Sequence, residues 1–309
     1  MDKKFSITIP AYKRTYLKDA IDSCLVQTYK DFELIIVNDS SPEDLESIVR
    51  LYSDTRIRYY KNEINCGAVN VVDNWNKCLE YATGDYIICM GDDDMLLPNC
   101  LEEYDKLIGK YPGLGVYHAW TQIINENGEF VNITEARPEY ESVYSLIWHR
   151  WDNRNKQFIG DFLFDANLLR KNGGFYKLPL AWASDDLTAT IAAAQNGIAN
   201  TQSICFSYRV NSQTISSSNY SDIKMDALIE ESRWYEVFLK TKPTTELDIK
   251  FWECIIRIMH LHFEKQKRQT VAKDLKCNSL LRVIHWIKKR KKYNLNTRII
   301  LYSIIQSLK

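Results

Sequence analysis

The sequence of 309 residues is poor in glycine and proline and carries no net charge. Its 11 glycines and 7 prolines are too few for a collagen-like or low-complexity chain. No apolar run approaches the roughly 18–20 residues that span a bilayer, and the longest one near the end covers only residues 299–305. The start lacks the apolar core and cleavage site of a signal peptide. We therefore expect a cytosolic globular protein with one or two domains.

Disulfide and zinc frameworks are also missing from the sequence. None of the eight cysteines forms a Cys-x-x-Cys pair, and scattered cysteines in apolar surroundings are usually small core residues. His260 and His262 stand two residues apart in a helical segment, so they point to different faces of the helix. Neither residue type therefore indicates a metal site.

Three phosphate-binding or nucleophile motifs are absent as well. The sequence contains no Gly-x-Gly-x-x-Gly, no Gly-x-x-x-x-Gly-Lys-Ser/Thr and no Gly-x-Ser-x-Gly. These absences argue against a Rossmann dehydrogenase, a P-loop NTPase and an α/β-hydrolase.

The first hundred residues alternate short apolar runs with amphipathic segments. The patterns predict strands at 5–9, 32–37, 57–60 and 86–90, and helices at 16–27, 42–52 and 68–82, the second with Ser41 as N-cap. Further strands are expected at 116–124 and 204–210, helices at 168–174 and 187–195, and only helices after residue 222. This order predicts an α/β fold with a doubly wound, mostly parallel sheet.

Polar clusters follow three of the predicted strands, at residues 10–14, 38–41 and 92–94. Ligands of such sheets bind beyond the carboxyl ends of the strands. The last cluster is three consecutive aspartates, which repel one another unless a cation neutralises them. Mg²⁺ or Mn²⁺ suits carboxylates together with phosphate oxygens, and the alternative is a solvated loop before a helix.

Five segments in order resemble the motifs of family 2 glycosyltransferases, which have the GT-A fold. They are residues 7–14, 27–41, 65–67, 82–87 and 91–94, with weaker matches at 173–175, 184–186 and 208–209. The resemblance implies a GT-A-like domain over 1–217. Beyond it, the residue pattern predicts a basic helical region over 218–309. Within the domain, 1–110 would be the nucleotide-binding half and 111–217 the acceptor half.

The resemblance implies an inverting transfer of a sugar from a nucleotide diphosphate sugar, with a UDP-sugar as the expected donor. The acceptor would be a hydroxyl of a glycan or lipid-linked molecule, as in bacterial surface-polysaccharide synthesis. The nucleotide-binding residues it implies are Pro10, Ala11, Tyr12, Arg14, Asp39, Asn65, Gly67, Asp92 and Asp93. Among these, Asp39 would accept a hydrogen bond from the base.

Asp94 would hold Mn²⁺ or Mg²⁺ under this resemblance. Gly91 replaces the first Asp of the family's Asp-x-Asp-Asp pattern, so Asp92 is a second expected metal ligand. The segment after Asn65 lacks the Arg that many members carry. A contact to the diphosphate would therefore come from Arg14 or Arg209.

The family's general base aligns with Asp186 of the pair Asp185 and Asp186. A neighbouring like charge raises proton affinity, which suits a base near neutral pH. The alternative for the pair is a double cap of a helix. Trp182 is predicted either to stack on a sugar or to pack in the core. Arg209 is a further expected contact of the acceptor or sugar.

The basic surplus lies at the C-terminal end. Residues 264–309 carry 13 basic and 2 acidic side chains, a net charge of +11, so the rest carries −11. Residues 280–309 combine apolar spacing with the basic run 288–292, which predicts a helix on an anionic membrane surface or a solvated helical end. A nucleic acid is disfavoured as a partner. A second copy of the chain is another candidate partner, and the expected location is the cytoplasm or the inner face of the plasma membrane.

Two other functions stay open on the sequence. A nucleotidyltransferase has a similar sheet and acidic metal site, but its Gly-rich basic N-terminal loop is not matched by residues 10–14. An inactive sugar-nucleotide-binding subunit of an assembly is the other alternative, because Gly91 and Asp185 depart from the family pattern.

Overall fold

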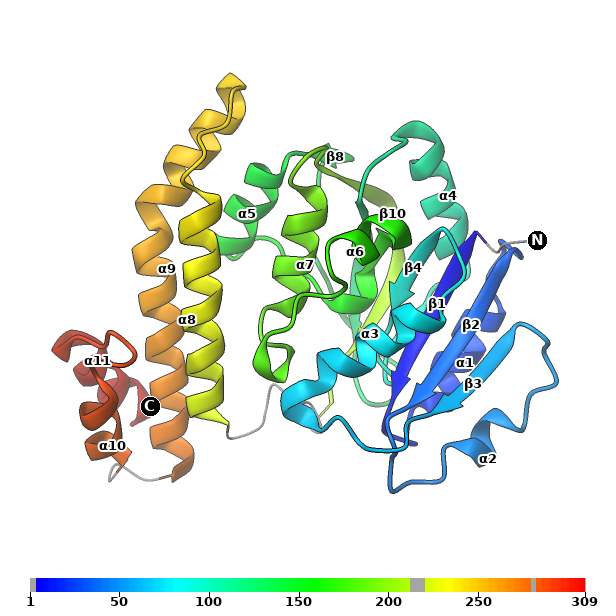
Figure 1. Ribbon diagram of the computed structural model, residues 1–309, viewed down its shortest axis with the longest axis horizontal. Helices are drawn as coiled ribbons and strands as arrows, with labels where there is room; N and C mark the ends of the chain where they lie inside the picture. Colours follow the sequence, from blue (N-terminus) through cyan, green and yellow to red (C-terminus); the bar gives the residue numbers. More distant parts are fainter. Residues whose placement is uncertain (1–3, 212–219, 279–281, 309) are drawn as a thin grey trace. The chain divides into compact units, whose positions relative to one another are not determined.

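The computed structural model describes residues 4–211, 220–278 and 282–308 (Figure 1). The chain divides into two compact units. The N-terminal unit comprises residues 1–177 and 184–212, and the C-terminal unit comprises residues 178–183 and 213–309. The expected boundary at 217/218 lies outside the described residues.

The N-terminal unit is built on a ten-stranded sheet in the order β3-β2-β1-β4-β9-β6-β10-β5, with β7 paired to β6 and β8 to β10. The strands are β1 Phe5–Ala11, β2 Phe32–Asn38, β3 Ile57–Lys61, β4 Tyr86–Cys89, β5 Met95–Leu96, β6 Val116–Ile124, β7 Phe130–Ile133, β8 Tyr140–Glu141, β9 Phe162–Asp165 and β10 Ile198–Arg209. The first four of the order run parallel, with Ile7 opposite both Leu34 and Ile88. Strand β9 is antiparallel to β4 and β6, while β10 runs parallel to β6.

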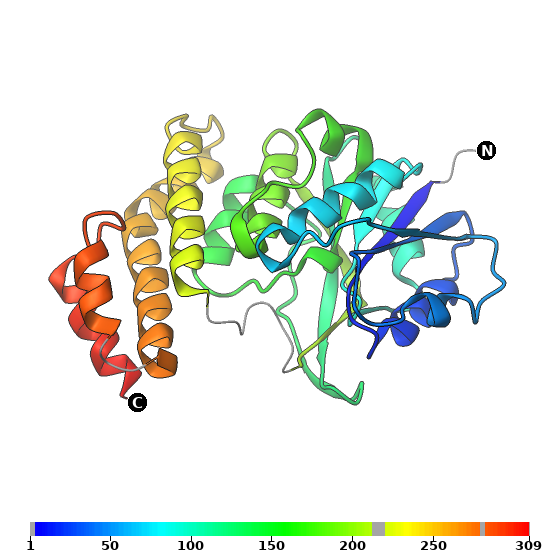
Figure 2. The same ribbon diagram turned by 60° about the horizontal axis from the view of Figure 1, so that its bottom comes forward.

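Helices cover both faces of this sheet (Figures 1 and 2). They are α1 Leu17–Leu25, α2 Glu46–Val49, α3 Val71–Tyr81, α4 Cys100–Lys110, α5 Val143–Trp151, α6 Ala166–Lys171 and α7 Ser184–Ala193. Residues of α1, α2 and α4 pack on the face of β1 that carries Phe5, Ile7 and Ile9. Helix α3 contacts β1 and β2 separately from that cluster. Because β2 is buried on both faces, its sequence contains the continuous apolar run 34–37.

The predicted helix over 42–52 is wrong in extent. Only Glu46–Val49 is α-helical, and its N-cap is Leu45 rather than Ser41. The Ser41 hydroxyl donates instead to the Tyr12 carbonyl, 2.6 Å away, and Ser40 has a φ of 49°. This segment is therefore shaped by its contact with the loop after β1. Helices α4 and α5 and strand β9 were not predicted, and β10 begins six residues before the expected strand.

The C-terminal unit is helical, as expected. It contains α8 Ser221–Phe238, α9 Glu246–Asn278, α10 Arg282–Lys289 and α11 Thr297–Ser307, and α8 and α9 lie side by side (Figures 1 and 2). Its core includes Met225, Leu275 and Trp286, and the Trp286 indole donates to the buried Asp274 at 2.8 Å. Of the helices in the described residues, none is long and apolar enough to cross a membrane.

Candidate functional site

The loop after β4 is tied to the loop after β1 through Asp92. One carboxylate oxygen of Asp92 accepts the backbone N–H groups of both Tyr12 and Lys13, each at 2.7 Å. Burial and the charge of Asp93 raise the pKa of Asp92 to about 6. The hydroxyl of Ser41 reaches the same loop after β1. The three polar clusters predicted at strand ends therefore do lie together.

Asp39, after β2, forms hydrogen bonds with the segment that follows β3. Its carboxylate accepts the Asn62 side-chain amide at 2.8 Å and the Cys66 backbone N–H at 2.9 Å. The Asn65 side chain donates to the Asp39 carbonyl at 2.5 Å, and Gly67 turns the chain with a φ of 75°, a conformation that favours glycine. The structure thus brings the predicted nucleotide residues Asp39, Asn65 and Gly67 together.

The other predicted nucleotide-binding residues lie at the end of β1 and in the loop after it, and they differ in exposure. Pro10 and Ala11 belong to β1, and the Tyr12 side chain is exposed. Arg14 is exposed and lies beside the loop before α2, where its backbone N–H donates to Glu43 and its guanidinium donates to the Asp44 carbonyl at 3.4 Å.

One carboxylate oxygen of Asp93 and one of Asp94 face a space that exists because Gly91 has no side chain. Oδ1 of Asp93 and Oδ2 of Asp94 each lie 2.9 Å from the position that a Cβ on Gly91 would occupy. The other oxygens are engaged: Asp94 Oδ1 accepts the Arg209 backbone N–H at 2.9 Å, and Asp93 Oδ2 accepts the Asn211 amide at 2.8 Å. Within the described residues, no donor reaches the first two oxygens. Burial, followed by the charge of Asp93, raises the pKa of Asp94 well above its usual value.

This open space fits a hard divalent cation. Carboxylate oxygens at the space left by Gly91 are the ligands that Mg²⁺ and Mn²⁺ favour, and such ions are commonly held by one or two carboxylates plus substrate phosphates. Across the described part of the chain, no three His, Cys, Asp or Glu side chains form a ready-made metal cage. The phosphate oxygens of a ligand would therefore have to complete the coordination. One oxygen of Asp92 already accepts two backbone N–H groups, so Asp93 and Asp94 are favoured as the metal ligands.

The buried Arg209 contacts the loop that carries Asp93. Its side chain is 2% exposed, and its guanidinium donates to the carbonyls of Asp93 at 2.8 Å and Glu126 at 3.0 Å. It also pairs with Asp19 at 3.2 Å and lies 4.3 Å from the centre of the Tyr16 ring. These contacts give Arg209 a positioning role for the loop of Asp93, and its predicted contact with sugar or acceptor stays a prediction.

The pair at the start of α7 divides into two different environments. The Arg150 guanidinium contacts both carboxylate oxygens of Asp186, at 2.9 and 3.1 Å, and Gln157 donates to one of them. Asp185 receives no side-chain donor from the residues that the structure describes. Burial and the charge of Asp186 raise its pKa to about 7.

Tyr208 of β10 is affected both by Asp185 and by the loop that carries Asp93 and Asp94. Burial raises the pKa of Tyr208 to about 12, and the charges of Asp94, Asp93 and Asp185 all add to this shift. These three carboxylates are therefore near enough to one side chain of β10 to affect its pKa. Asp161, whose side chain is fully buried, adds to the raised pKa of both Asp94 and Asp185.

Trp182 falls in the C-terminal unit, where it packs against the core cluster that contains Met225 and Leu228. The Lys224 ammonium lies 4.9 Å from its ring centre. These contacts favour the packing interpretation of Trp182. Its stacking on a sugar remains a prediction.

Several residues of the site were not predicted from the sequence. Lys13 places its ammonium 3.4 Å from Asp93, and it stands inside a motif that was recognised for its neighbours. Asn62, Arg150 and Gln157 are single residues outside any motif, and Tyr208 was noted only as the neighbour of Arg209 in a weak match. Only their three-dimensional contacts reveal them.

Comparison with known proteins identifies the class. The profile of the family described as "Glycosyl transferase family 2" matches residues 6–174, more than half of the chain. The chain therefore belongs to this family. Uncharacterised glycosyltransferases of Rickettsia typhi and Methanocaldococcus jannaschii are 36% and 35% identical, and the matches span 32% and 48% of their lengths.

A longer match is the Escherichia coli UDP-Glc:alpha-D-GlcNAc-diphosphoundecaprenol beta-1,3-glucosyltransferase WfgD. It is 27% identical over 231 residues, which cover 72% of this chain and 83% of that protein. Among solved structures, Staphylococcus aureus TarS 1-349 in complex with UDP-GlcNAc superposes with a TM-score of 0.66 at 16% identity and covers 99% of this chain and 88% of its own. This likeness confirms the GT-A-like fold.

Proposed function

We propose that this glycosyltransferase moves a sugar from a UDP-sugar to a hydroxyl of a glycan or lipid-linked acceptor, with inversion and with a divalent metal ion. The observation that carries the proposal is the pair of carboxylate oxygens of Asp93 and Asp94 at the space left by Gly91, with Asp185 near enough to act on the same Tyr208 as they do. A cation site and a candidate base thus share one location, next to the Asp39 loop. The names of WfgD and of the TarS complex, both with UDP-sugars, support the choice of donor, and the diphosphoundecaprenol in the name of WfgD supports a lipid-linked acceptor.

Asp39 would accept the N–H of the nucleobase. Its Oδ1 is occupied by Asn62 and Cys66, while its Oδ2 makes only a longer contact of 3.2 Å with the Cys66 N–H among the described residues. Asn62 and Cys66 therefore hold the carboxylate so that one oxygen can face a ligand. A base that offers an N–H, such as uracil, fits this acceptor.

Asp93 and Asp94 would hold Mn²⁺ or Mg²⁺ together with the donor's diphosphate. The bound ion would neutralise the charge that develops on the departing diphosphate. Lys13, which already contacts Asp93, would add a second positive charge at the same place.

Asp185 would remove the proton from the acceptor hydroxyl. The hydroxyl oxygen then forms its bond to the anomeric carbon while the bond from that carbon to the diphosphate oxygen breaks, and the proton stays on Asp185. A base with a pKa near 7 is half ionised near neutral pH and still basic enough to accept a proton. Asp186 aligns with the family's base, but its contacts with Arg150 favour a role in holding Asp185 and the start of α7 in place.

The C-terminal unit would bind the anionic surface of a membrane. In the basic run 288–292, Lys289 pairs with Asp222 at 2.8 Å and Lys292 with Asp226 at 2.5 Å, so these two stabilise the unit itself. Lys288, Arg290 and Lys291 have no such partner in the described residues. Exposed apolar side chains accompany them, namely Ile284 and Ile287 on α10 and Leu301, Ile305 and Leu308 in or after α11. Basic and apolar groups together are typical of interfacial helices.

One experiment separates the proposed function from its alternatives. The protein is incubated with a panel of nucleotide sugars and Mn²⁺, with and without lipid-linked and free glycan acceptors, and the released nucleotide is measured. UDP release from a UDP-sugar that rises with acceptor supports the transferase. Formation or consumption of pyrophosphate would instead indicate a nucleotidyltransferase, and binding that leaves every sugar intact would indicate an inactive binding subunit.

A further inference from the structure

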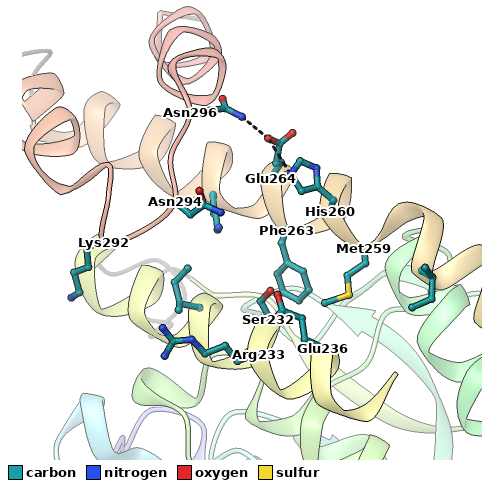
Figure 3. A pocket seen from close by; sticks show the side chains of 13 residues that line it. Ser232, Arg233, Glu236, Met259, His260, Phe263, Glu264, Lys292, Asn294 and Asn296 are labelled. Carbon is teal, nitrogen blue, oxygen red and sulfur yellow. Dashed lines mark hydrogen bonds and ion pairs between the residues drawn. The ribbon is translucent and has the colours of Figure 1, made fainter. Parts of the chain in front are cut away.

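A cavity of about 450 Å³ opens in the C-terminal unit between α8, α9 and the segment 292–296 (Figure 3). This volume lies within the range of small-molecule sites. The side chains that line it are Ile229, Ser232, Arg233, Glu236, Ile256, Met259, His260, Phe263, Glu264, Lys267, Lys292, Asn294 and Asn296. None of them belongs to the site of the N-terminal unit.

The apolar part of the lining comes from α8 and α9. Ile229, Ile256, Met259 and Phe263 supply it, and Phe263 points from α9 toward Ser232 of α8 (Figure 3). The Phe263 ring belongs to a buried residue, so it has a fixed place in the wall. A rigid aromatic and aliphatic surface suits the apolar face of a ligand that is polar elsewhere.

Lys267 is the most informative polar residue of the lining. It is 8% exposed, and its ammonium group has no hydrogen bond or ion pair with any residue that the structure describes. Burial lowers its pKa, which the more distant charges of Glu264 and Glu236 oppose. The ammonium group is therefore a donor in the cavity wall that a ligand's acceptor could use, and such a hydrogen bond would add affinity.

The cavity offers unused donors and acceptors side by side. The side chains of Ser232, Arg233 and Asn294 make no hydrogen bond within the described residues. Glu264 accepts the Asn296 amide at 2.7 Å and lies 3.8 Å from His260, contacts that fix its carboxylate at the edge of the cavity (Figure 3). Glu236 adds a second carboxylate.

We propose that this cavity binds a neutral sugar residue of a glycan chain, as a second carbohydrate site apart from the catalytic one. A sugar hydroxyl both donates and accepts, so it can use Lys267 and Arg233 as well as Glu236 and Ser232. A phosphate group would bring negative charge next to the carboxylates of Glu236 and Glu264, which oppose the attraction of the cationic side chains in the lining. An apolar peptide would cover the Lys267 ammonium without giving it an acceptor. The biological role of this site rests on the proposed function, because an enzyme that extends a glycan has glycan chains as its acceptors. Binding of a sugar in the cavity does not itself require sugar transfer.

The test measures binding of simple probes to the full chain. Methyl glycosides of glucose, galactose, mannose, rhamnose and N-acetylglucosamine are titrated at millimolar concentration, and saturation-transfer NMR and calorimetry follow the complex. At least one probe should bind to the native chain. Lys267→Met should weaken that binding about fivefold or more, and Ser232→Trp, which fills the cavity, should abolish it. Lys276→Met, an exposed change on the same helix α9, should leave it unchanged.

The result distinguishes this inference from the proposed function. Lys267→Met should keep the native rate of nucleotide release from the donor sugar, so a loss of glycoside binding with normal donor turnover supports a second site. Three results would overturn it: no glycoside binds to the native chain, binding survives both Lys267→Met and Ser232→Trp, or inorganic phosphate binds in the same cavity more tightly than every glycoside. Thermal unfolding of each variant shows that the C-terminal unit is intact.

Discussion

The Arg150 guanidinium contacts both carboxylate oxygens of Asp186, while the adjacent Asp185 has no cationic partner of this kind among the described residues, and its pKa is raised to about 7. Two neighbouring carboxyl groups at the start of one helix therefore have different surroundings. Burial is the larger cause of the raised pKa of Asp185, and the charge of Asp186 adds to it. The pattern is typical of sites in which one carboxylate acts as a base and another positions it.

Replacement of either acid should reveal which of them takes the proton. Turnover of the native enzyme should rise with pH and level off above about pH 7, because Asp185 must lose its proton to act. Asp185→Asn should lower kcat about 100-fold or more without a comparable change in donor affinity, and should remove this pH dependence. Asp186→Asn should keep measurable turnover with a shifted pH profile. If Asp186→Asn removes turnover while Asp185→Asn retains it, the assignment by sequence alignment is the correct one.

The same replacement should stabilise the fold at alkaline pH. Because the pKa of Asp185 is raised on folding, its contribution to stability is fully present below the unfolded value and is lost as the pH rises through about 7. Asp185→Asn should therefore raise the free energy of unfolding at pH 8 by about 1–2 kcal/mol, allowing for its partial exposure. Near pH 4 the effect should vanish. Urea unfolding at both pH values checks this, and equal effects at the two would show that the carboxyl is not perturbed.

Gly91 should be required for the space between the carboxylates. A Cβ there would lie 2.9 Å from oxygens of both Asp93 and Asp94, closer than carbon and oxygen tolerate. Gly91 does not need a positive φ, so Gly91→Ala should fold. We expect it to weaken Mn²⁺-dependent binding of a UDP-sugar about tenfold or more by moving the carboxylates. Gly109→Ala is the matched control, because nothing lies near its added Cβ. Equal Mn²⁺ titrations for the two variants would contradict this.

Arg209 should matter for the integrity of the site more than for direct contact with a ligand. Arg209→Met removes donors to the carbonyls of Asp93 and Glu126 and should lower the free energy of unfolding by about 3 kcal/mol. Arg209→Lys should recover only part of this, since an ammonium cannot reproduce the planar set of donors. Denaturant unfolding measures both. Normal stability with a loss of acceptor affinity alone would assign Arg209 to the acceptor instead.

Membrane binding should depend on the unpaired basic residues of the C-terminal unit. The full chain should co-sediment with liposomes containing phosphatidylglycerol at low salt, and added salt should release it. Replacing Lys288, Arg290 and Lys291 by Gln should abolish sedimentation. The control replaces the exposed Lys250 and Lys276 of α9 and Lys240, which lies between α8 and α9, by Gln, with the same change in charge. Equal loss in both would indicate general charge attraction, and no loss in either would contradict a membrane role for this run.

The strand-end motifs could be predicted because each is a local pattern. A strand followed by Asp39, or by Asp92, Asp93 and Asp94, places side chains at a known edge of a parallel sheet. The positions of β9 and α5 depend instead on contacts across the chain: β9 is four residues long and pairs with β4 and β6. Arg150 lies in the last turn of α5, which was not predicted. Nothing local indicated that it would face Asp186.

The charge pattern was predicted only in part. The basic run is visible in the sequence, but its separation into ion-paired Lys289 and Lys292 and unpaired neighbours depends on where Asp222 and Asp226 lie on α8. The cavity between α8 and α9 likewise had no signal, because its lining comes from three separate segments. Sequence periodicity identifies a helix, but not the space that two helices enclose.

The central claim is that the carboxylates after β4 support metal-dependent sugar transfer. Its most direct test is UDP release from UDP-sugars, with acceptor and with increasing Mn²⁺, for the native chain, Asp94→Ala and the control Asp85→Ala. Asp85 is exposed and lies at the opposite end of β4. The account predicts Mn²⁺-stimulated release by the native chain and by Asp85→Ala, and a loss of about 100-fold or more in a folded Asp94→Ala. Mn²⁺-stimulated release that persists in Asp94→Ala would contradict it.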